Sequence, residues 1–450
     1  MPLGPFSRRR FLAALSALAV TACNPGELTS KPVARIALPR QVTLLVPVPD
    51  QPSADRLAVR TRDYQNQNPN TKIDLRPVPG MPRGPFDADK WVELLYNLAS
   101  AAAFDAVVGW DVWAPGMIDR GILRPLDPYL VDIGRPLERY FMNSSVQAFR
   151  RWGRVWMLPW QAQPVMLFYN RWLFDQAGID PPTTRWTWLD VEVAGGPLTR
   201  GSDKAKTWGY DVGGGPEVLV FQNGGRLVDD PIEPTKPTLN DPANVEAFEW
   251  VEGLVQRLKI SPGIADFRQF EGRMGAFAGG QIAMRLDRMG VRGGAYVGSP
   301  AAWSFPWSAV APPGRVLRAT TANFQSWGIL VSSAQVDDAW GVIRHLCTQL
   351  PGEAKIDGVP AFLTLQSSPD LARLLPEGTE PYLRALDEAV PTPPIPAANT
   401  ISQLLSNALF RTVAGQASAA DALRSAQQDA LKAWNAQPAP APAASGPPSP

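Results

Sequence analysis

The sequence predicts an α/β fold in which two doubly wound lobes are joined by a three-segment hinge. Apolar strands alternate with amphipathic helices along much of the chain, a pattern typical of parallel sheets covered by helices. Two short apolar strands flank a polar and aromatic stretch at 160–163, which suits a segment that crosses between lobes. The length of 450 residues is also enough for several domains.

The N-terminal segment is predicted to export and anchor the protein. Arg8 and Arg9 precede an apolar run too short to span a bilayer, so residues 1–22 resemble a twin-arginine signal peptide. Small residues before Cys23 resemble a lipobox, and residues 23–40 are then expected to form a lipid-anchored tether. The alternative is an accidental cysteine in a plain signal peptide. At the other end, the Pro- and Ala-rich residues 437–450 are expected to be a disordered tail.

Cysteine content and charge argue against a disulfide-bonded fold and against a nucleic-acid-binding protein. Cys23 and Cys347 are the two cysteines, so a lipid on Cys23 leaves Cys347 without a disulfide partner. The formal charge of +1 falls by three, to about −2, when residues 1–22 with their three arginines are removed. No basic stripe is visible, and no nucleic-acid partner is expected.

The first lobe is predicted to comprise residues 41–160 and 307–350. Its strands are expected at 42–46, 72–78 and 104–111, and its helices at 54–66, at 91–102 and through Met117 and Ile118. In such sheets, ligands bind outside the carboxyl ends of the strands. The candidate ligand contacts that follow these strands are Asp50, Trp110, Asp111 and Trp113.

The crossing to the second lobe is expected between two short strands. Residues 155–158 are apolar and are followed by Pro159, which is expected to end the first strand, while 165–169 form the second. Trp160, Gln161 and Gln163 would then lie on an exposed bend beside the cleft. Asn170 is suited to cap the next helix, and Gly178 to end it.

Residues 152–190 contain a longer motif that includes this crossing. It contains Gly153, Pro159, Tyr169, Asn170, Phe174, Ala177, Gly178, Pro181, Pro182, Thr187 and Trp188 at characteristic spacings. In these residues the chain resembles the extracellular solute-binding proteins of bacterial ABC importers, in the branch that carries sugars. Arg171 stands where Lys is commoner, and three residues are inserted before Trp186. The resemblance implies a maltose-binding-protein-like fold (type II) and docking on membrane permease subunits.

The second lobe is predicted at 161–306 and 351–436. The glycines at 213–215 are expected to form a turn, with Gly214 near the ligand, rather than a phosphate cradle. A helix with a clear apolar period follows Asn240, and a strand at 281–287 brings Asp287 to the cleft. The chain is expected to return at 303–307, to rejoin the first sheet at 323–331 and to form a helix over 336–350. A third crossing is expected near 351–352, followed by helices at 371–375, 382–390, 401–413 and 420–434.

The residues favour a binding protein over an enzyme. The single histidine, His345, falls within a predicted helix, and the sequence has no nucleophile elbow, zinc cluster or EF-hand loop. Neither a cofactor nor a metal is expected. A glycan-acting enzyme remains an alternative, because such an enzyme needs only a pair of carboxylates. Asp111 and Asp287, on facing lobes, are the candidates for this pair. A receptor-coupled sugar sensor on the same scaffold is another alternative.

The 16 tryptophans favour a carbohydrate solute. A Trp ring that covers about 80 Å² of a sugar's apolar face contributes about 2 kcal/mol, while polar side chains bind the hydroxyls. The expected solute is an oligosaccharide or a related polyol or sugar phosphate, because Arg285 and Arg288 could reach a phosphate. The protein is expected to bind it as a monomer. The predicted ligand-binding residues are Asp50, Trp110, Asp111, Trp113, Trp160, Gln161, Gln163, Gly214, Asp287, Trp303, Trp307, Asn323 and Trp327.

Overall fold

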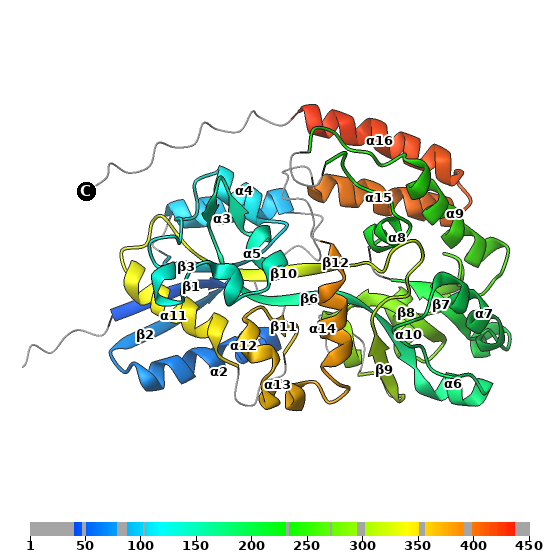
Figure 1. Cartoon of the computed structure of the whole chain (residues 1–450), viewed down its shortest axis with the longest axis horizontal. Coiled ribbons are helices and arrows are strands. Elements are labelled where there is room, and N and C mark those ends of the chain that lie inside the picture. The colour runs from blue at the N-terminus through cyan, green and yellow to red at the C-terminus, as the bar shows by residue number, and fades with distance from the viewer. Residues whose placement is uncertain are drawn as a thin grey trace, which may run out of the picture. The chain divides into compact units, whose positions relative to one another are not determined.

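The computed structural model describes residues 40–46, 51–78, 88–101, 104–213, 215–230, 234–270, 272–294, 302–350, 356–390 and 398–436 (Figure 1). Several predictions lie outside the described residues: the signal peptide, Cys23 and the tether up to residue 39, Asp50, Gly214, the crossing at 351–352 and the tail at 437–450. Arg40, predicted to end the tether, instead begins the first strand.

Three parallel strands form one end of the sheet. β1 (Arg40–Val46) pairs with β2 (Thr71–Pro77) on one edge and with β3 (Ala106–Trp110) on the other. The connecting helices are α2 (Gln51–Gln67) and α3 (Ala88–Ala101), and α4 (Ala114–Asp119) follows β3. Val42 and Leu44 of β1 and Val107 of β3 are buried, because both strands lie inside the sheet and are covered by helices.

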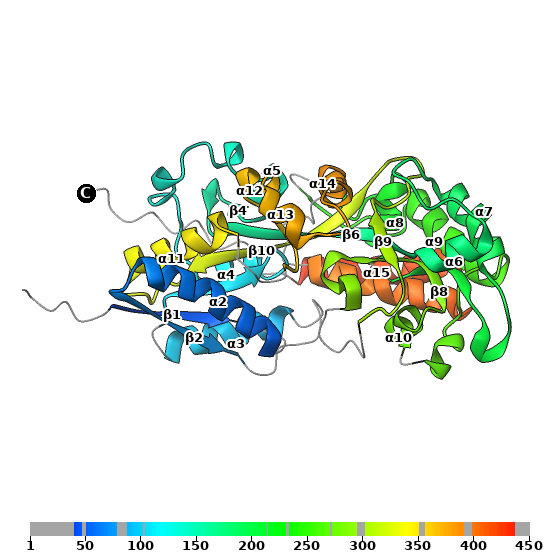
Figure 2. The ribbon, with the colours of Figure 1, turned by 90° about the horizontal axis from the view of Figure 1, so that it is seen from below.

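The sheet is mixed rather than parallel as predicted. β10 (Thr320–Ile329) lies between β3 and β6 (Leu158–Asn170) and runs antiparallel to both. β6 pairs with β10 from Leu158 to Pro164, and with β8 (Ile282–Arg288) from Val165 to Tyr169. Figure 2 shows β6 and β10 running side by side. We call β2, β1, β3, β10 and β6 up to Pro164 the first half-sheet, and β6 from Val165 with its partners the second half-sheet.

β6 is one continuous strand, whereas the sequence predicted two strands and a bend. The predicted stop at Pro159 fails because the ladder is irregular there: Gln325 lies opposite Gln161, but Ser326 lies opposite Pro159. Trp160 is thus the extra residue of a β-bulge, where a proline, which donates no ladder hydrogen bond, is tolerated. Trp160, Gln161 and Gln163 therefore lie on a strand.

The second half-sheet continues with β8 and β7 (Trp208–Val212), which are parallel, and with β9 (Trp307–Val310), which runs antiparallel to β6. Its helices are α6 (Arg171–Ala177), α7 (Trp188–Leu198), α8 (Glu217–Gln222), α9 (Pro242–Gln256), α10 (Gly272–Ala278), α15 (Ala398–Val413) and α16 (Ala419–Asn435). As predicted, the Asn170 side chain caps α6 by accepting from the Leu173 amide, and Gly178, at φ 67°, ends it.

The chain returns later than predicted. Trp307–Val310 pairs with Leu167–Asn170, so residues 303–307 still belong to the second half-sheet, and β10 makes the return. β11 (Val359–Pro360) pairs with Gln161 and Ala162, and Ala361 packs in the core of the first half-sheet, although the sequence assigned both to the second lobe. The remaining described helices and strands are β4 (Arg150–Arg151), β5 (Arg154–Val155), β12 (Ala389–Val390), α5 (Asn143–Ala148), α11 (Val336–Thr348), α12 (Leu363–Gln366), α13 (Pro369–Leu374) and α14 (Glu380–Asp387), with short 3-10 turns between them.

Trp327 lies in the core rather than at a ligand site. Its side chain has 0% exposure and shares a cluster with Trp340 and Ile343 of α11. Ala322 and Phe324, of the opposite parity on β10, belong to a different cluster, because side chains alternate across a strand. Among the described helices, none has the length and apolar character to cross a bilayer.

Trp327→Ala should lower the free energy of unfolding by about 3–5 kcal/mol, because it leaves a cavity in a closed core. Denaturant unfolding followed by circular dichroism measures the change. Trp172→Ala is the control, since Trp172 on α6 is 52% exposed and should change stability by less than about 0.5 kcal/mol. Equal effects of the two substitutions would contradict this placement of Trp327.

Candidate functional site

A cavity of about 340 Å³ lies where the two half-sheets meet. Val112, which follows β3, lines it from the first half-sheet, and Arg288 lines it from the end of β8. The loop after β7 contributes Gly213 and Gly215, and Glu217 begins α8. Further lining residues come from β10, α9, the segment after α9, α10 and α15. Because both half-sheets contribute, the cavity can respond to their relative position.

Asp111 is a buried carboxyl group beside this cavity, next to Val112. It is only 8% exposed, and neither carboxylate oxygen has a hydrogen-bond partner among the described residues. Burial raises the pKa of Asp111 to about 7, while the backbone amides of Phe324 and Val112 and the charge of Arg288 act in the opposite direction. Near neutral pH the group can therefore either accept or donate a hydrogen bond.

Two other polar groups near Val112 also lack partners. Asn399, at the start of α15, donates from Nδ2 to the Val112 carbonyl at 3.0 Å, and its buried Oδ1 has no partner among the described residues. The buried Nε of Arg288 likewise has no partner in the described part of the chain. Buried polar atoms are normally hydrogen-bonded, so acceptors and a donor gathered here suit a polar ligand.

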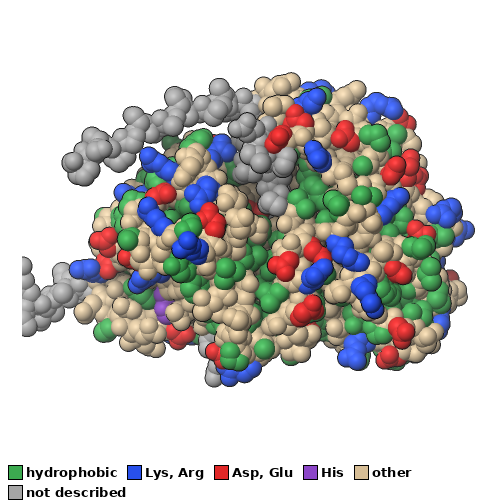
Figure 3. Space-filling view, in the orientation of Figure 1, with side chains coloured by type: hydrophobic (Ala, Val, Ile, Leu, Met, Phe, Trp, Pro, Cys, Tyr) green, Lys and Arg blue, Asp and Glu red, His purple; other side chains and the backbone are tan. Residues whose placement is uncertain are grey.

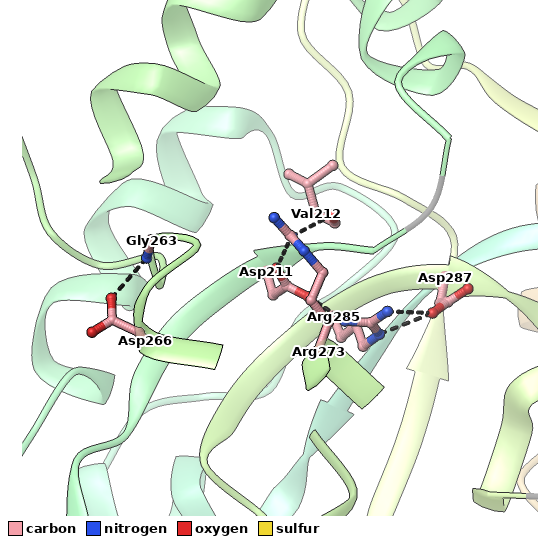
Figure 4. A network of polar contacts seen from close by, with 7 residues as sticks. All are labelled: Asp211, Val212, Gly263, Asp266, Arg273, Arg285 and Asp287. Carbon is pink, nitrogen blue, oxygen red and sulfur yellow. Dashed lines mark hydrogen bonds and ion pairs between the residues drawn. The ribbon is translucent and has the colours of Figure 1, made fainter. Parts of the chain in front are cut away.

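A buried ionic network supports the wall of the cavity (Figure 4). Asp211 of β7 is completely buried and binds both Arg285 of β8 and Arg273 of α10, the latter at 2.5 Å. Arg285 also binds Asp287 at 2.8 Å, and a second Arg273 hydrogen bond reaches the Val212 carbonyl at 3.2 Å. Two carboxylates and two guanidinium groups thus neutralise one another in a site where a lone charge would be costly.

Gly213 is required by this network. A Cβ atom at residue 213 would collide with the guanidinium group of Arg285. The loop that contains these glycines lines the cavity through Gly213 and Gly215. Because Gly213 has no side chain, the guanidinium group of Arg285 can lie directly against its backbone.

The predicted polar site residues have different roles in the structure. Asn323 lines the cavity, and Asp111 lies next to it. Asp287 is engaged by Arg285 and by the Arg288 amide at 2.8 Å, so it braces the wall rather than facing Asp111 as a free second carboxylate. Gln161 donates to Gln325 at 2.5 Å, and the side chain of Gln163 packs against Gly290. Arg285, expected to reach a phosphate, is likewise held by its carboxylates.

The predicted tryptophans do not line the cavity. Trp113 is 3% exposed and packs on Trp91, and Trp303 packs between Phe168 and Phe277, so both are core residues. The guanidinium group of Arg60 lies 5.0 Å from the ring of Trp160. Trp110 and Trp307 are partly buried against the same cluster as Trp303. Phe410 supplies the aromatic ring in the described lining.

The polar lining residues that the sequence predictions missed include Glu217, Arg273, Asn399, Ser402 and Ser406. The spacing of the last three could have identified them, because residues 399, 402 and 406 fall on one face of a helix. That helix was predicted at 401–413, as one of the helices that complete the second lobe, whereas α15 begins at Ala398. Among the described residues, no group of three metal-ligating side chains could hold an ion.

Comparison with known proteins agrees with this architecture. A family model described as bacterial extracellular solute-binding protein matches residues 48–346, about two thirds of the chain. The predicted α/β fold of the maltose-binding-protein type is confirmed by solved structures that cover most of the chain. An ABC substrate-binding protein from Listeria monocytogenes in complex with cycloalternan superimposes with a TM-score of 0.72 and 22% identity, over 88% of this chain and 99% of that one.

Two further solved structures are similar. A cyclic α-maltosyl-1,6-maltose binding protein from Arthrobacter globiformis gives a TM-score of 0.69 at 20% identity, over 88% of this chain and 99% of that one. Maltose-bound MalE3 of T. maritima gives 0.68 at 17%, over 87% and 99%. Among curated sequences, a "Putative binding protein" of Brucella abortus (strain 2308) is 28% identical over 138 residues. That match spans only 29% of each chain.

Asp211→Ala should lower the free energy of unfolding by about 3–5 kcal/mol, because it removes one of the two carboxylates that pair with the buried Arg285 and the carboxylate that pairs with Arg273. Chemical denaturation measures the loss. Asp421→Ala removes the carboxylate of an exposed pair with Arg424 and should leave the denaturation midpoint nearly unchanged. A midpoint for Asp211→Ala within error of the parent's would refute the proposed importance of the network.

Stability should depend on the ionisation of Asp111. Its folded pKa of about 7 lies above the unfolded value, so its contribution is fully present below about pH 4 and is lost as the pH rises toward 7. Asp111→Asn cannot ionise and should exceed the parent in stability at pH 8 by up to about 4 kcal/mol, with no difference near pH 4. Denaturation of both proteins from pH 4 to pH 8 tests this, and parallel curves would contradict it.

Proposed function

Because the chain belongs to the bacterial extracellular solute-binding protein family, we propose that it is the extracytoplasmic receptor of an ABC importer and captures a carbohydrate. The family is one of substrate-binding proteins that catalyse no reaction. The proposed solute is an oligosaccharide or a related polyol, delivered to permease subunits in the membrane. The observation that carries the proposal is the cavity between the half-sheets, where the Asp111 carboxylate, Arg288 Nε and Asn399 Oδ1 have no hydrogen-bond partner among the described residues.

The chemistry of the cavity supports a hydroxylated solute. A sugar hydroxyl both donates and accepts, so it can donate to Asp111 or to Asn399 Oδ1 while accepting from Arg288. Hydrogen bonds to charged groups contribute about 1.5–3 kcal/mol each, and a few of them reach micromolar affinity after ordering costs. The similar solved structures from Listeria, Arthrobacter and T. maritima carry cycloalternan, cyclic α-maltosyl-1,6-maltose and maltose in their descriptions.

We further propose that capture involves closure of two lobes built on the two half-sheets. Asp111 and Val112 come from the first half-sheet, while Arg288 comes from the second. A solute that contacts residues of both favours the arrangement in which they are close, so binding shifts the population toward the closed form. In this proposal β6 and β10 connect the two lobes, in place of the lobe boundaries predicted from the sequence.

The proposed location is the outer side of the cytoplasmic membrane, held there by a lipid on Cys23. The family description, extracellular, supports export. On the face shown in Figure 3, Lys and Arg side chains are interspersed with Asp and Glu, which supports a partner other than nucleic acid.

A thermal-shift screen of the mature protein should identify one stabilising class among sugars, maltodextrins, polyols and glycerol phosphates. A ligand at 100 times its dissociation constant adds roughly 2.7 kcal/mol of stability, a shift of several degrees. No shift with any class would refute the carbohydrate proposal. Release of reducing sugar from a glycan would instead favour the enzyme alternative.

Asn323→Ala should weaken binding of the stabilising sugar by about tenfold, because it removes one hydrogen-bonding side chain from the cavity. Isothermal titration calorimetry measures the affinity. Asn407→Ala is the matched control, because Asn407 is an exposed residue of α15 on another face of the helix. Equal affinities of the parent and Asn323→Ala would place the solute elsewhere.

A further inference from the structure

The wall that α15 gives to the cavity changes character along the helix. Asn399, Ser402 and Ser406 line it near the start of α15, whereas Leu409, Phe410 and Val413 line it near the end. At 1.5 Å per residue, 14 steps from Asn399 to Val413 span about 21 Å along the helix axis. The cavity therefore has one polar and one apolar stretch along this helix.

Neighbouring elements fix where each stretch lies. The polar start of α15 contacts the first half-sheet, because Asn399 donates to the Val112 carbonyl. The apolar end lies against α9, since Gln256 Nε2 donates to the Val413 carbonyl at 3.2 Å. Val251 and Val255 of α9, one helical turn apart, line the same cavity. The apolar side chains thus come from two packed helices.

The apolar stretch is poorly matched to a second hydroxylated sugar ring, because stacking one face of the ring on Phe410 would leave its hydroxyl groups against the aliphatic side chains of Leu409 and Val413. A hydroxyl buried there without a partner would cost roughly five- to 150-fold in affinity. Phe410 is 50% exposed although it lines a cavity, so a ligand can still cover it. Each methylene group buried against such a surface gains roughly fourfold.

Resting on the proposed function, we infer that the solute is amphiphilic. Its hydroxylated part occupies the polar stretch beside Asp111, Arg288 and Asn399, and an apolar substituent lies between α9 and the end of α15. The chemical class is a glycoside or polyol ester with an alkyl or aryl group, rather than a long, uniformly hydroxylated oligosaccharide.

Matched ligand pairs test this inference. Glucose, mannose, maltose and cellobiose are titrated calorimetrically against the mature protein, each beside its hexyl glycoside below the critical micelle concentration. For any sugar that binds, the hexyl glycoside should bind at least tenfold tighter. In Phe410→Ser and Leu409→Ser the ratio of hexyl glycoside affinity to sugar affinity should fall below about threefold.

Val331→Ser is the control, because Val331 is an exposed apolar residue outside the cavity lining and the hexyl advantage should survive there. Binding of a free sugar with no gain from its hexyl glycoside overturns the inference and leaves the proposed function standing. If the hexyl glycoside keeps its higher affinity in both Phe410→Ser and Leu409→Ser, the inference is also overturned, because the hexyl group then binds outside the apolar stretch. If neither sugars nor hexyl glycosides bind, the carbohydrate proposal and this inference fall together.

Discussion

The hydrogen-bond ladder of β6 is the constraint on which the rest of the structure depends. Along its 13 residues β6 pairs with β10 and β11 in the first half-sheet and with β8 and β9 in the second. A one-residue slip of this strand would reverse the faces of all its side chains, so its register is strongly specified. That register fixes the end of β8, and with it the position of Arg288 at the cavity.

The site treats its buried charges in two different ways. Asp211, Asp287, Arg273 and Arg285 satisfy one another and form a rigid support. Asp111 has no such partner among the described residues, and burial raises its pKa to about 7. The ionic network holds the wall of the cavity in place, whereas Asp111 remains able to form hydrogen bonds with a solute. Polar groups that would be a defect in a core are useful where a ligand completes their hydrogen bonds.

Local sequence signals predicted the elements well and their long-range relations poorly. Asn170 and Gly178 carry their own capping chemistry, and the prediction of α6 from them is confirmed. Pro159 was misread because the bulge that tolerates it depends on Ser326, which is distant in sequence. The return crossing was placed at aromatic residues near Trp307, whereas pairing with β6, which local patterns do not encode, puts it at β10.

The residues around the cavity were predicted in part for a related reason. Asp111, which adjoins the lining residue Val112, follows from the rule that ligands bind outside the carboxyl ends of strands in such sheets. Asn323 of β10 also lines the cavity. Trp113, Trp303 and Trp327 were chosen by residue type, but a Trp at a strand end can face either a core or a cleft, and the covering helices decide which. Asn399 and Ser402 belong to the same face of α15, and only the packing of that helix across the cavity gives them a role.

The pairing of β6 with β10 has a mechanical consequence. Among the described residues, β6 and β10 form a hydrogen-bonded ribbon between the half-sheets, so relative rotation would twist this ribbon. Such a ribbon acts as a torsion spring whose stiffness is spread over many peptide units, and its restoring torque grows with the angle. The bulge at Trp160 interrupts the regular ladder, and bulges increase the local twist of a strand. In the proposed closure, contacts with the solute would therefore work against the twist of this ribbon.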